Sequence, residues 1–415
     1  MKIPEINSVC FVGAGTMGCF NSLMAAAAGY QAVIYDISTA ALDQAPQVLE
    51  GMAGFLAAQG FFPPAAIPEA LARISVNPVL RDAVDAADLV SESVAERLEI
   101  KRDVHHTLDA ICSPATLITT NTSNLMVSDI EDVLVRGERF AALHSHLGSY
   151  VIDIVGGPRT SARTIDVLER YVLSIRGLPL VLKKENPGYV INAMLGPLLR
   201  TASVLVVEGH ATPEDVDRAW MLNQGAGIGP FGLMDLFGLN IIFDSWKKPQ
   251  LQQLPLQDKL IDFITPYIES GHLGIKTAKG FYGYPEPRYQ QTDFLETNRD
   301  LSLVYNALIA VLIENAILIA HDEVAAPIDI DRAWMTSFSL AQGPFAALDE
   351  MGIDTFCDTY RAFIGKGILQ GRVADQVESF LQPHIENSQL GVKSGQGFYG
   401  YPNPAFSAPN FIPER

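Results

Sequence analysis

Three glycines near the N-terminus have the spacing of a loop that binds dinucleotides. The run Gly13-Ala14-Gly15-Thr16-Met17-Gly18 follows a strand-like segment, 8–12, and opens a helical segment, 17–29. In a G-x-G-x-x-G motif the first glycine permits a tight turn, the second lets the backbone approach a pyrophosphate, and the third lets helix and strand pack closely. The free N–H groups at the helix N-terminus then face the phosphates. We therefore expect a cofactor site at Gly13, Gly15, Thr16, Met17 and Gly18.

An acidic residue in the expected position indicates which dinucleotide binds. A second strand-like segment, 32–35, ends at Asp36, 18 residues after Gly18. A carboxylate there can accept hydrogen bonds from the ribose hydroxyls of the adenosine, and it would repel a 2′-phosphate. NAD is therefore favoured over NADP. The alternative is a glycine-rich turn in which Asp36 caps the following helix.

Further along, three polar residues have the types that alcohol oxidation requires. Ser123 lies just after a strand-like segment, His144 ends another, and Asn192 lies near the start of a long helical segment. Oxidising a secondary alcohol needs a base for the hydroxyl proton, and histidine titrates in the appropriate range. Ser123 and Asn192 could hydrogen-bond the substrate oxygens. Taken singly, each could instead be structural: a turn serine, a structural histidine and a helix cap.

The order of these segments resembles that of the L-3-hydroxyacyl-CoA dehydrogenase family, and the resemblance covers nearly the whole chain. Besides the glycine motif it rests on four segments, which are Asn-Thr-Ser-x-Leu at 121–125, Arg-Phe-x-x-Leu-His at 139–144, Asn-Pro-Gly-aromatic-x-x-Asn at 186–192 and Gly-Pro-Phe-x-Leu-x-Asp at 229–235. The resemblance implies an NAD-dependent enzyme of fatty acid metabolism that oxidises a 3-hydroxyacyl-CoA.

The resemblance also implies roles for individual residues. The family's catalytic histidine matches His144, and its carboxylate partner, normally Glu, matches Asp153. Its serine and its helix asparagine match Ser123 and Asn192. The residues that match its cofactor-contacting groups are Glu96, Lys101, Ser123 and, in the first helical domain, Lys276. A carboxylate on the far nitrogen of a catalytic histidine fixes its tautomer and stabilises the imidazolium.

The chain departs from the family just after its histidine. The family usually has two aromatic residues and then Asn-Pro, whereas this chain has Ser145-His146-Leu147-Gly148-Ser149. The acid, Asp153, is one methylene shorter than the usual Glu. If the strand continues, His146 points to the same side as His144, because side chains two residues apart share a face. Either histidine could therefore be the base.

The region expected to meet CoA is also unusual. No lysine occurs between Ile3 and Ile100, although the family commonly offers one there for a CoA phosphate, and the run 60–64 is apolar, which is typical of core or of a lid. The substrate is therefore expected to be an acyl group, most simply a CoA thioester. A free 3-hydroxy acid or an acyl group on another carrier is a second possibility. A protein that binds NAD without catalysis is a third, and the presence of Ser123, His144 and Asn192 argues against it.

Strand-like and helical segments alternate through the first part of the chain. Strands are expected at 8–12, 32–35, 88–90 and 117–119, with helical segments between them. Strands separated by helices predict a parallel, doubly wound α/β sheet of the Rossmann type. We expect this dinucleotide-binding domain to cover residues 1–184.

After residue 183 the pattern becomes helical, and it is duplicated. The run Val216–Met221 recurs at Ile330–Met335, and Gly229-Pro230-Phe231 recurs at Gly343-Pro344-Phe345, in both cases 114 residues later. Such matches at a constant spacing indicate a repeated domain. We therefore expect two all-α domains, at 185–287 and 300–405, which pack against each other as an internal pseudo-dimer. The chain would then be a monomer, although a homodimer is compatible with this packing.

Composition excludes several classes of function. The net charge is −18, which argues against nucleic acid or an anionic membrane surface as the main partner, and no segment is expected to be long and apolar enough to span a bilayer. The four cysteines form no C-x-x-C pair, so no metal is expected. Sparse cysteine and the absence of a signal peptide favour a reducing, cytoplasmic location.

Overall fold

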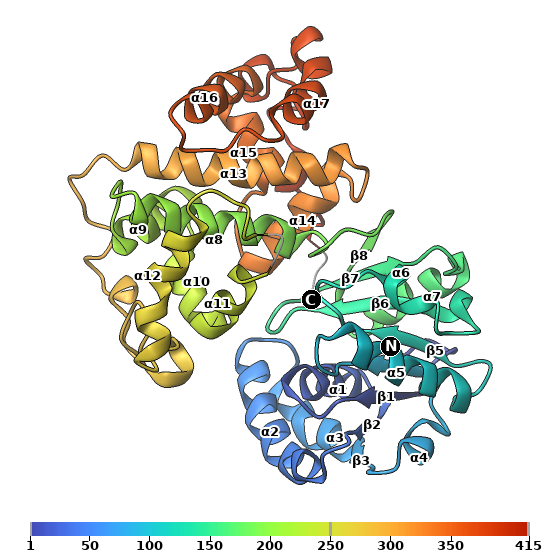
Figure 1. The fold of residues 1–415 in the computed structure, drawn as a ribbon. Coiled ribbons are helices and arrows are strands. Elements are labelled where there is room, and N and C mark those ends of the chain that lie inside the picture. Colours follow the sequence, from blue (N-terminus) through green and yellow to red (C-terminus); the bar gives the residue numbers. More distant parts are fainter. Residues whose placement is uncertain (1, 249–250, 413–415) are drawn as a thin grey trace. The chain divides into compact units, whose positions relative to one another are not determined.

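The computed structural model describes residues 2–248 and 251–412, and its chain divides into two compact units (Figure 1). The first unit contains the sheet and runs to Val190. It also includes Glu323–Asp329, which the sequence analysis did not predict. This return segment is tied to the first unit by a hydrogen bond from Lys183 N to Val324 O, 2.9 Å long. The second unit contains both helical copies except for this return segment.

The first unit is built on an eight-stranded sheet in the order β3-β2-β1-β4-β5-β6-β7-β8. Its strands are β1 (Ser8–Val12), β2 (Gln31–Tyr35), β3 (Ile74–Val76), β4 (Leu89–Glu92), β5 (Leu117–Thr120), β6 (Phe140–Ser145), β7 (Val151–Gly156) and β8 (Leu178–Leu182). All neighbours are parallel except β6 and β7, which are antiparallel. The prediction of a parallel-dominated sheet is confirmed. The antiparallel pair follows from the short connection between β6 and β7, since a parallel pair needs a crossover of a dozen or more residues.

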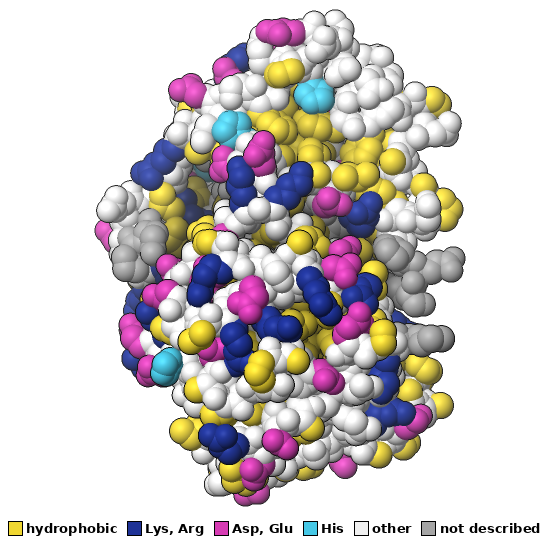
Figure 2. All heavy atoms as spheres, turned by 90° about the vertical axis from the view of Figure 1, so that its right-hand side faces the viewer, with side chains coloured by type: hydrophobic (Ala, Val, Ile, Leu, Met, Phe, Trp, Pro, Cys, Tyr) yellow, Lys and Arg dark blue, Asp and Glu magenta, His cyan; other side chains and the backbone are white. Residues whose placement is uncertain are grey.

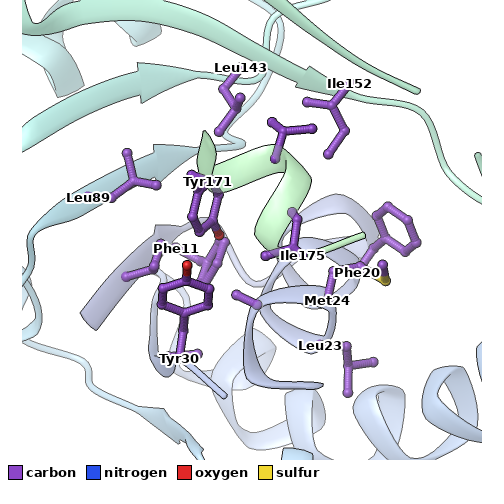
Figure 3. Close-up of a cluster of buried hydrophobic side chains, with 14 of the residues drawn as sticks. Phe11, Phe20, Leu23, Met24, Tyr30, Leu89, Leu143, Ile152, Tyr171 and Ile175 are labelled. Carbon is purple, nitrogen blue, oxygen red and sulfur yellow. The ribbon is translucent and has the colours of Figure 1, made fainter. Parts of the chain in front are cut away.

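Seven α-helices of the first unit connect these strands in the part of the chain that is described. They are α1 (Thr16–Ala27), α2 (Thr39–Ala58), α3 (Ile67–Ala72), α4 (Leu80–Val84), α5 (Leu98–Ile111), α6 (Val127–Glu131) and α7 (Ala162–Ser174). Side chains from β1, β6 and β7 form a core with α1 and α7, which includes Phe11, Leu143, Ile152 and Tyr171 (Figure 3).

The apolar run at 60–64 belongs to this core. Phe61 and Phe62 are buried, and the Phe61 ring stacks on Tyr150, with centroids 4.1 Å apart and planes inclined by 7°. The sequence left two interpretations of this run, core and lid. The structure supports the core. Because Tyr150 immediately precedes β7, this stacking anchors the loop that joins the two strands carrying His144 and Asp153.

In the residues that the structure describes, each of the two helical copies contains five α-helices. The first set is α8 (Ile191–Val207), α9 (Pro213–Gln224), α10 (Pro230–Phe237), α11 (Leu239–Trp246) and α12 (Gln257–Glu269), and the second is α13 (Ser302–His321), α14 (Pro327–Phe338), α15 (Pro344–Met351), α16 (Ile353–Gly365) and α17 (Ala374–Glu386). Helix α13 packs against α8 and α9 of the first copy.

The two copies use the same buried aspartate to start a helix. Asp217 of α9 accepts hydrogen bonds from Phe231 N and Gly232 N, at 2.7 and 2.9 Å, in the first turn of α10. Asp331 of α14 does the same for α15. The carboxylate satisfies backbone donors that have no partner within the helix. The repeat found in the sequence is thus a repeat of specific contacts.

One helix corrects the statement that no segment could span a membrane. By length and composition α13 is apolar enough to do so. Within the structure 61% of its apolar window is buried. Such burial is typical of a core helix, and α13 takes that role between the two copies.

Basic and acidic side chains are interspersed on the face of the molecule shown in Figure 2, without one broad basic area. With a net charge of −18, the chain must hold an anionic ligand by local groups rather than by a general positive field.

Candidate active site

The glycine loop has the geometry that a dinucleotide requires. Gly13 has a φ of +115°, and a Cβ there would lie 2.6 Å from Ser93 O. A Cβ at Gly18 would lie 1.8 Å from Gly13 O, whereas one at Gly15 would meet no atom within 4 Å. Gly15 is also the N-cap residue of α1, and no side chain accepts a hydrogen bond from the backbone N–H groups at this helix end. The open space over Gly15 and the uncapped helix N-terminus therefore fit a pyrophosphate.

The first two residues of α1 are Thr16 and Met17, the former exposed and the latter half-buried. The first turn of α1 contains no acidic residue. An anion at this helix end would therefore meet backbone N–H groups without repulsion from a nearby carboxylate of the same turn.

Asp36 follows β2 and is joined to the glycine loop. Its Oδ2 accepts from Ala14 N and its Oδ1 accepts from Ser38 N, both at 2.8 Å. The side chain that caps α2 is that of Ser38, which accepts from Ala41 N. The alternative in which Asp36 caps that helix is therefore wrong. Its half-buried carboxylate keeps acceptor capacity for hydroxyl groups.

His144 and Asp153 form a buried pair because of the antiparallel register. The two residues lie directly opposite each other on β6 and β7. His144 Nδ1 is 2.8 Å from Asp153 Oδ2, and the two residues are 5% and 0% exposed. The carboxylate fixes the Nδ1–H tautomer, so Nε2 carries the lone pair that a general base needs.

Burial and neighbouring charges set the protonation states of this pair. Burial, followed by the proximity of His146, lowers the pKa of His144 below its ordinary value, although Asp153 and Glu96 favour the charged form. Burial alone would raise the pKa of the Asp153 carboxyl, but the two histidines hold it below its usual value. The pair is therefore a neutral imidazole beside a carboxylate at neutral pH, which is the state that accepts a proton.

His146 shares the carboxylate of Asp153. Its Nε2 lies 2.9 Å from the same Oδ2, and its ring packs edge-on against His144, with centroids 4.4 Å apart. Potential ligand atoms of the three residues lie within 4.8 Å of one another, as in some metal sites. Both histidine nitrogens are at hydrogen-bond distance from Asp153, however, so hydrogen bonds account for the arrangement.

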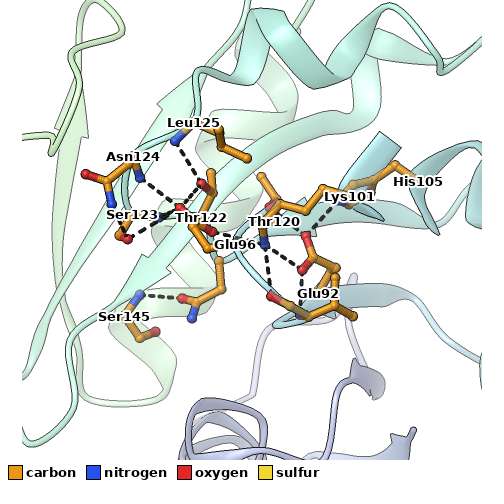
Figure 4. Close-up of polar contacts among 12 residues, drawn as sticks. Glu92, Glu96, Lys101, His105, Thr120, Thr122, Ser123, Asn124, Leu125 and Ser145 are labelled. Carbon is orange, nitrogen blue, oxygen red and sulfur yellow. Dashed lines mark hydrogen bonds and ion pairs between the residues drawn. The ribbon is translucent and has the colours of Figure 1, made fainter. Parts of the chain in front are cut away.

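The loop that carries Ser123 is held by Glu96 (Figure 4). Glu96 Oε1 accepts from Thr122 Oγ1 at 2.6 Å and from the backbone N–H groups of Ser123 and Asn124 at 2.9 and 3.0 Å. The loop is next to the end of β6, because Asn121 Oδ1 accepts from Ser145 N at 2.8 Å. The fold thus brings the Ser123 loop beside the strand end that carries His144.

Lys101 lies behind Glu96 and is nearly completely buried. Its Nζ is 2.7 Å from Glu92 Oε1 and 3.4 Å from Glu96 Oε2. It therefore faces acidic side chains of its own domain, and cofactor contact by Lys101 stays a prediction.

Glu92, at the end of β4, was missed by the sequence analysis. It accepts from Lys101, from Thr120 Oγ1 at 2.7 Å and from His105 Nε2 at 2.9 Å. Burial would raise the pKa of its carboxyl, but His105 and Lys101 lower it to about 2. The signal available in the sequence was an acidic residue that ends the buried strand Leu-Val-Ser-Glu.

Two predicted residues lie in the second unit. Asn192 is half-buried in the first turn of α8, and its approach to His144 stays a prediction. Lys276 Nζ contacts Asn240 Oδ1. In the second copy Lys393 Nζ makes the same contact with Asp354. A lysine at this position therefore has a polar partner within its own helical copy, which explains its presence without a cofactor. Cofactor contact by Lys276 also stays a prediction.

Comparison with known proteins extends this geometry. The family model described as 3-hydroxyacyl-CoA dehydrogenase, NAD binding domain, matches residues 8–185. The model of the C-terminal domain of the same family matches twice, at 188–284 and 303–401. The second match coincides with the internal repeat.

Individual relatives cover most of the chain. A 5-formyl-3-hydroxy-2-methylpyridine 4-carboxylate 5-dehydrogenase of Mesorhizobium japonicum is 31% identical over 72% of this chain and 96% of its own length. A probable 3-hydroxybutyryl-CoA dehydrogenase of Bacillus subtilis is 30% identical over 68% of this chain and 99% of its own. The crystal structure of 3-hydroxybutyryl-CoA dehydrogenase from Escherichia coli shares the fold over 92% of this chain and 99% of its own, with a TM-score of 0.76 and 20% identity.

Proposed function

Because this chain belongs to the 3-hydroxyacyl-CoA dehydrogenase family and is an NAD-dependent oxidoreductase of that type, we propose that it transfers a hydride between NAD and the 3-hydroxy group of an acyl-CoA. The observation that carries this proposal is the His144–Asp153 pair, buried at the end of β6 beside the loop of Ser123. A base, its carboxylate partner and a hydroxyl-bearing loop come together where the sheet ends.

His144 is the general base of the proposed reaction. Its Nε2 accepts the proton of the substrate hydroxyl as the hydride leaves the same carbon. Asp153 stabilises the imidazolium that results, and in the reverse direction the same Nε2 returns the proton to the ketone oxygen. The depressed pKa of His144 keeps the ring neutral before the proton arrives.

NAD supplies the hydride acceptor when it is bound. Gly13, Gly15 and Gly18 leave room for its pyrophosphate, the first turn of α1 offers N–H groups from Thr16 and Met17, and Asp36 accepts from its ribose hydroxyls.

Four further residues complete the proposed site. Ser123 and Asn192 hydrogen-bond the substrate oxygens and hold the carbinol carbon in place. Glu96 and Lys101 act by shaping the Ser123 loop, since Glu96 accepts four hydrogen bonds from it. Lys276 is retained as a candidate contact for the cofactor from the first helical copy.

A second candidate substrate is a hydroxy compound without CoA. The segment from Ile3 to Ile100 has no lysine for a CoA phosphate, and the apolar run that replaces such residues is buried against Tyr150. The Mesorhizobium japonicum relative is named for a pyridine carboxylate, a substrate without CoA. These observations support a smaller carboxylic acid as the second candidate substrate.

An NADH-absorbance assay of the purified chain decides between the two substrates. The panel contains 3-hydroxyacyl-CoAs of several chain lengths, the same 3-hydroxy acids without CoA, and a hydroxymethyl pyridine carboxylate. We expect turnover with at least one acyl-CoA, and much slower turnover with the His144→Ala variant. Turnover confined to the free acids would replace the first candidate with the second, and no turnover with any compound contradicts both.

The four cysteines are buried and free of disulfides. A reducing location, such as the cytoplasm, is the location that we propose on this ground.

A further inference from the structure

Two histidines converge on one oxygen of Asp153. Oδ2 of this aspartate is 2.8 Å from His144 Nδ1 and 2.9 Å from His146 Nε2. The other oxygen, Oδ1, is buried and has no hydrogen-bond partner. The side-chain hydrogen bonds of the carboxylate therefore all involve Oδ2.

A buried carboxylate needs such donors to remain ionised. Transfer of a charge from water to a protein interior is unfavourable unless hydrogen bonds or opposite charges replace the lost water. With Asp153 0% exposed and Oδ1 unpartnered, removal of one donor from Oδ2 leaves the N–H of the other histidine alone. His144 would then face a carboxylate that is less stably ionised and free to rotate.

We propose that His146 is a positioning residue of the reaction, whose Nε2–H keeps the Asp153 carboxylate ionised and aimed at Nδ1 of His144. The proposal rests on the function proposed above, in which His144 is the base. His146 acts on the substrate only through Asp153 and His144. It also occupies a place where, by the resemblance noted in the sequence, an aromatic residue is usual.

The proton positions are consistent with this role. In the resting state His144 Nδ1–H and His146 Nε2–H both donate to Asp153, and His144 Nε2 is unprotonated. When the substrate proton arrives at His144 Nε2, the only new charge is an imidazolium beside the carboxylate. A charge on His146, whose ring centroid is 4.4 Å from that of His144, would repel this imidazolium.

His146 has an electrostatic effect in addition to its hydrogen bond. The groups that face His144 are His146 on the same strand, Asp153 on β7, Glu96 before α5 and the Tyr189 ring, whose centroid is 5.2 Å away. Among them His146 lowers the pKa of His144, and Asp153 and Glu96 raise it. Loss of charge at position 146 with the donor retained should therefore raise the pKa of His144.

Two substitutions test the hydrogen-bond donor and the aromatic ring of His146 separately. His146→Gln keeps an Nε2–H donor at a similar reach but cannot become charged. His146→Phe keeps a ring of similar size but has no donor. His106→Gln, at an exposed histidine on α5, is the matched control. All variants are assayed with NAD and the active substrate in the presence of a chelator, so that a bound metal cannot contribute.

We expect His146→Phe to lower kcat about 10- to 100-fold with little change in KM, as is typical of residues that orient a catalytic group. His146→Gln should keep most of the parent kcat. The acidic limb of its pH profile for alcohol oxidation should move to higher pH than in the parent protein. His106→Gln should match the parent protein. Two results overturn the proposal: a kcat in His146→Phe equal to that of the parent, or loss of turnover in both variants while His144→Ala stays active, which would make His146 the base.

An NMR titration tests the same contact without turnover. The Nδ1–H proton of His144 should give a downfield signal in the parent protein and in His146→Gln, and the signal should weaken or shift in His146→Phe. An unchanged signal and an unchanged pKa of His144 in His146→Phe contradict the proposal. If these signals change as expected while no compound of the panel is turned over, the proposed function fails and the positioning by His146 stands.

Discussion

Gly18 lies so close to Gly13 that a Cβ on Gly18 would be 1.8 Å from the Gly13 carbonyl oxygen. Gly15, between them in the sequence, has open space where its Cβ would be. The three glycines of one motif therefore serve different ends: Gly18 permits the packing of α1 on β1, and Gly15 leaves room for a ligand.

This difference predicts opposite consequences for two alanine variants. Gly18→Ala should destabilise the first unit by about 1–3 kcal/mol, the usual range for an overpacked core site. Gly15→Ala should keep the parent melting temperature but bind NADH much more weakly. Thermal unfolding and NADH fluorescence titration measure the two effects. A Gly15→Ala variant that binds NADH as tightly as the parent would show that the pyrophosphate does not lie over Gly15.

The parent protein should prefer NAD to NADP because of the Asp36 carboxylate. Asp36→Ala should narrow the ratio of kcat/KM for the two cofactors. This variant also loses the acceptor for Ala14 N, so Asp36→Asn, which can keep that hydrogen bond without the charge, is the control. Comparable kcat/KM for NAD and NADP in the parent protein would show that Asp36 does not select the cofactor.

His144→Ala should lower kcat by roughly 10²–10⁴-fold, the contribution typical of a general base, without weakening NAD binding. In the parent protein only neutral His144 accepts a proton, and burial lowers its pKa. Alcohol oxidation should therefore persist below the ordinary histidine pKa and disappear as pH falls through the lower pKa of the folded protein. A pH profile whose acidic limb lies above the ordinary histidine value would assign the limb to another group.

The duplication provides an internal control for Asn192. Asn306 is its counterpart in α13, is also half-buried, and lines an open pocket of about 400 Å³ with Arg299 and Tyr305. We expect Asn192→Ala to lower kcat/KM by about 10²-fold, as for the loss of one polar group that stabilises a reacting oxygen. Asn306→Ala should leave kcat/KM unchanged. Equal losses in both variants would indicate a general effect on the helical unit.

Truncation after Pro287 should yield an aggregated or insoluble fragment. The second copy packs through α13 onto α8 and α9, so its removal uncovers an apolar face that a soluble monomer rarely exposes. Size-exclusion chromatography of the fragment and of the full chain, which we expect to be a monomer, tests this packing. A fragment that is soluble, monomeric and fully active contradicts our account of the duplication.

The sequence by itself determined the features that depend on local spacing. The three glycines lie within six residues of one another and Asp36 ends the next strand, so the motif, the strand and the helix could be recognised together. The two helical copies were equally clear, because short motifs such as Gly-Pro-Phe recur in both copies at a constant spacing. Even the starts of α10 and α15, which the buried aspartates cap, are marked by these motifs.

Only the tertiary structure decided which distant polar groups meet. His144 could be suspected as a base, but the direction of β7, and hence the pairing of Asp153 with both His144 and His146, depends on the register of an antiparallel pair. The ion pair between Glu92 and Lys101 could not be predicted from the sequence, because it depends on the packing of α5 beside the end of β4. Contacts of this kind are set by the packing of whole elements against each other, because a shift of one residue along a strand turns every side chain to the opposite face.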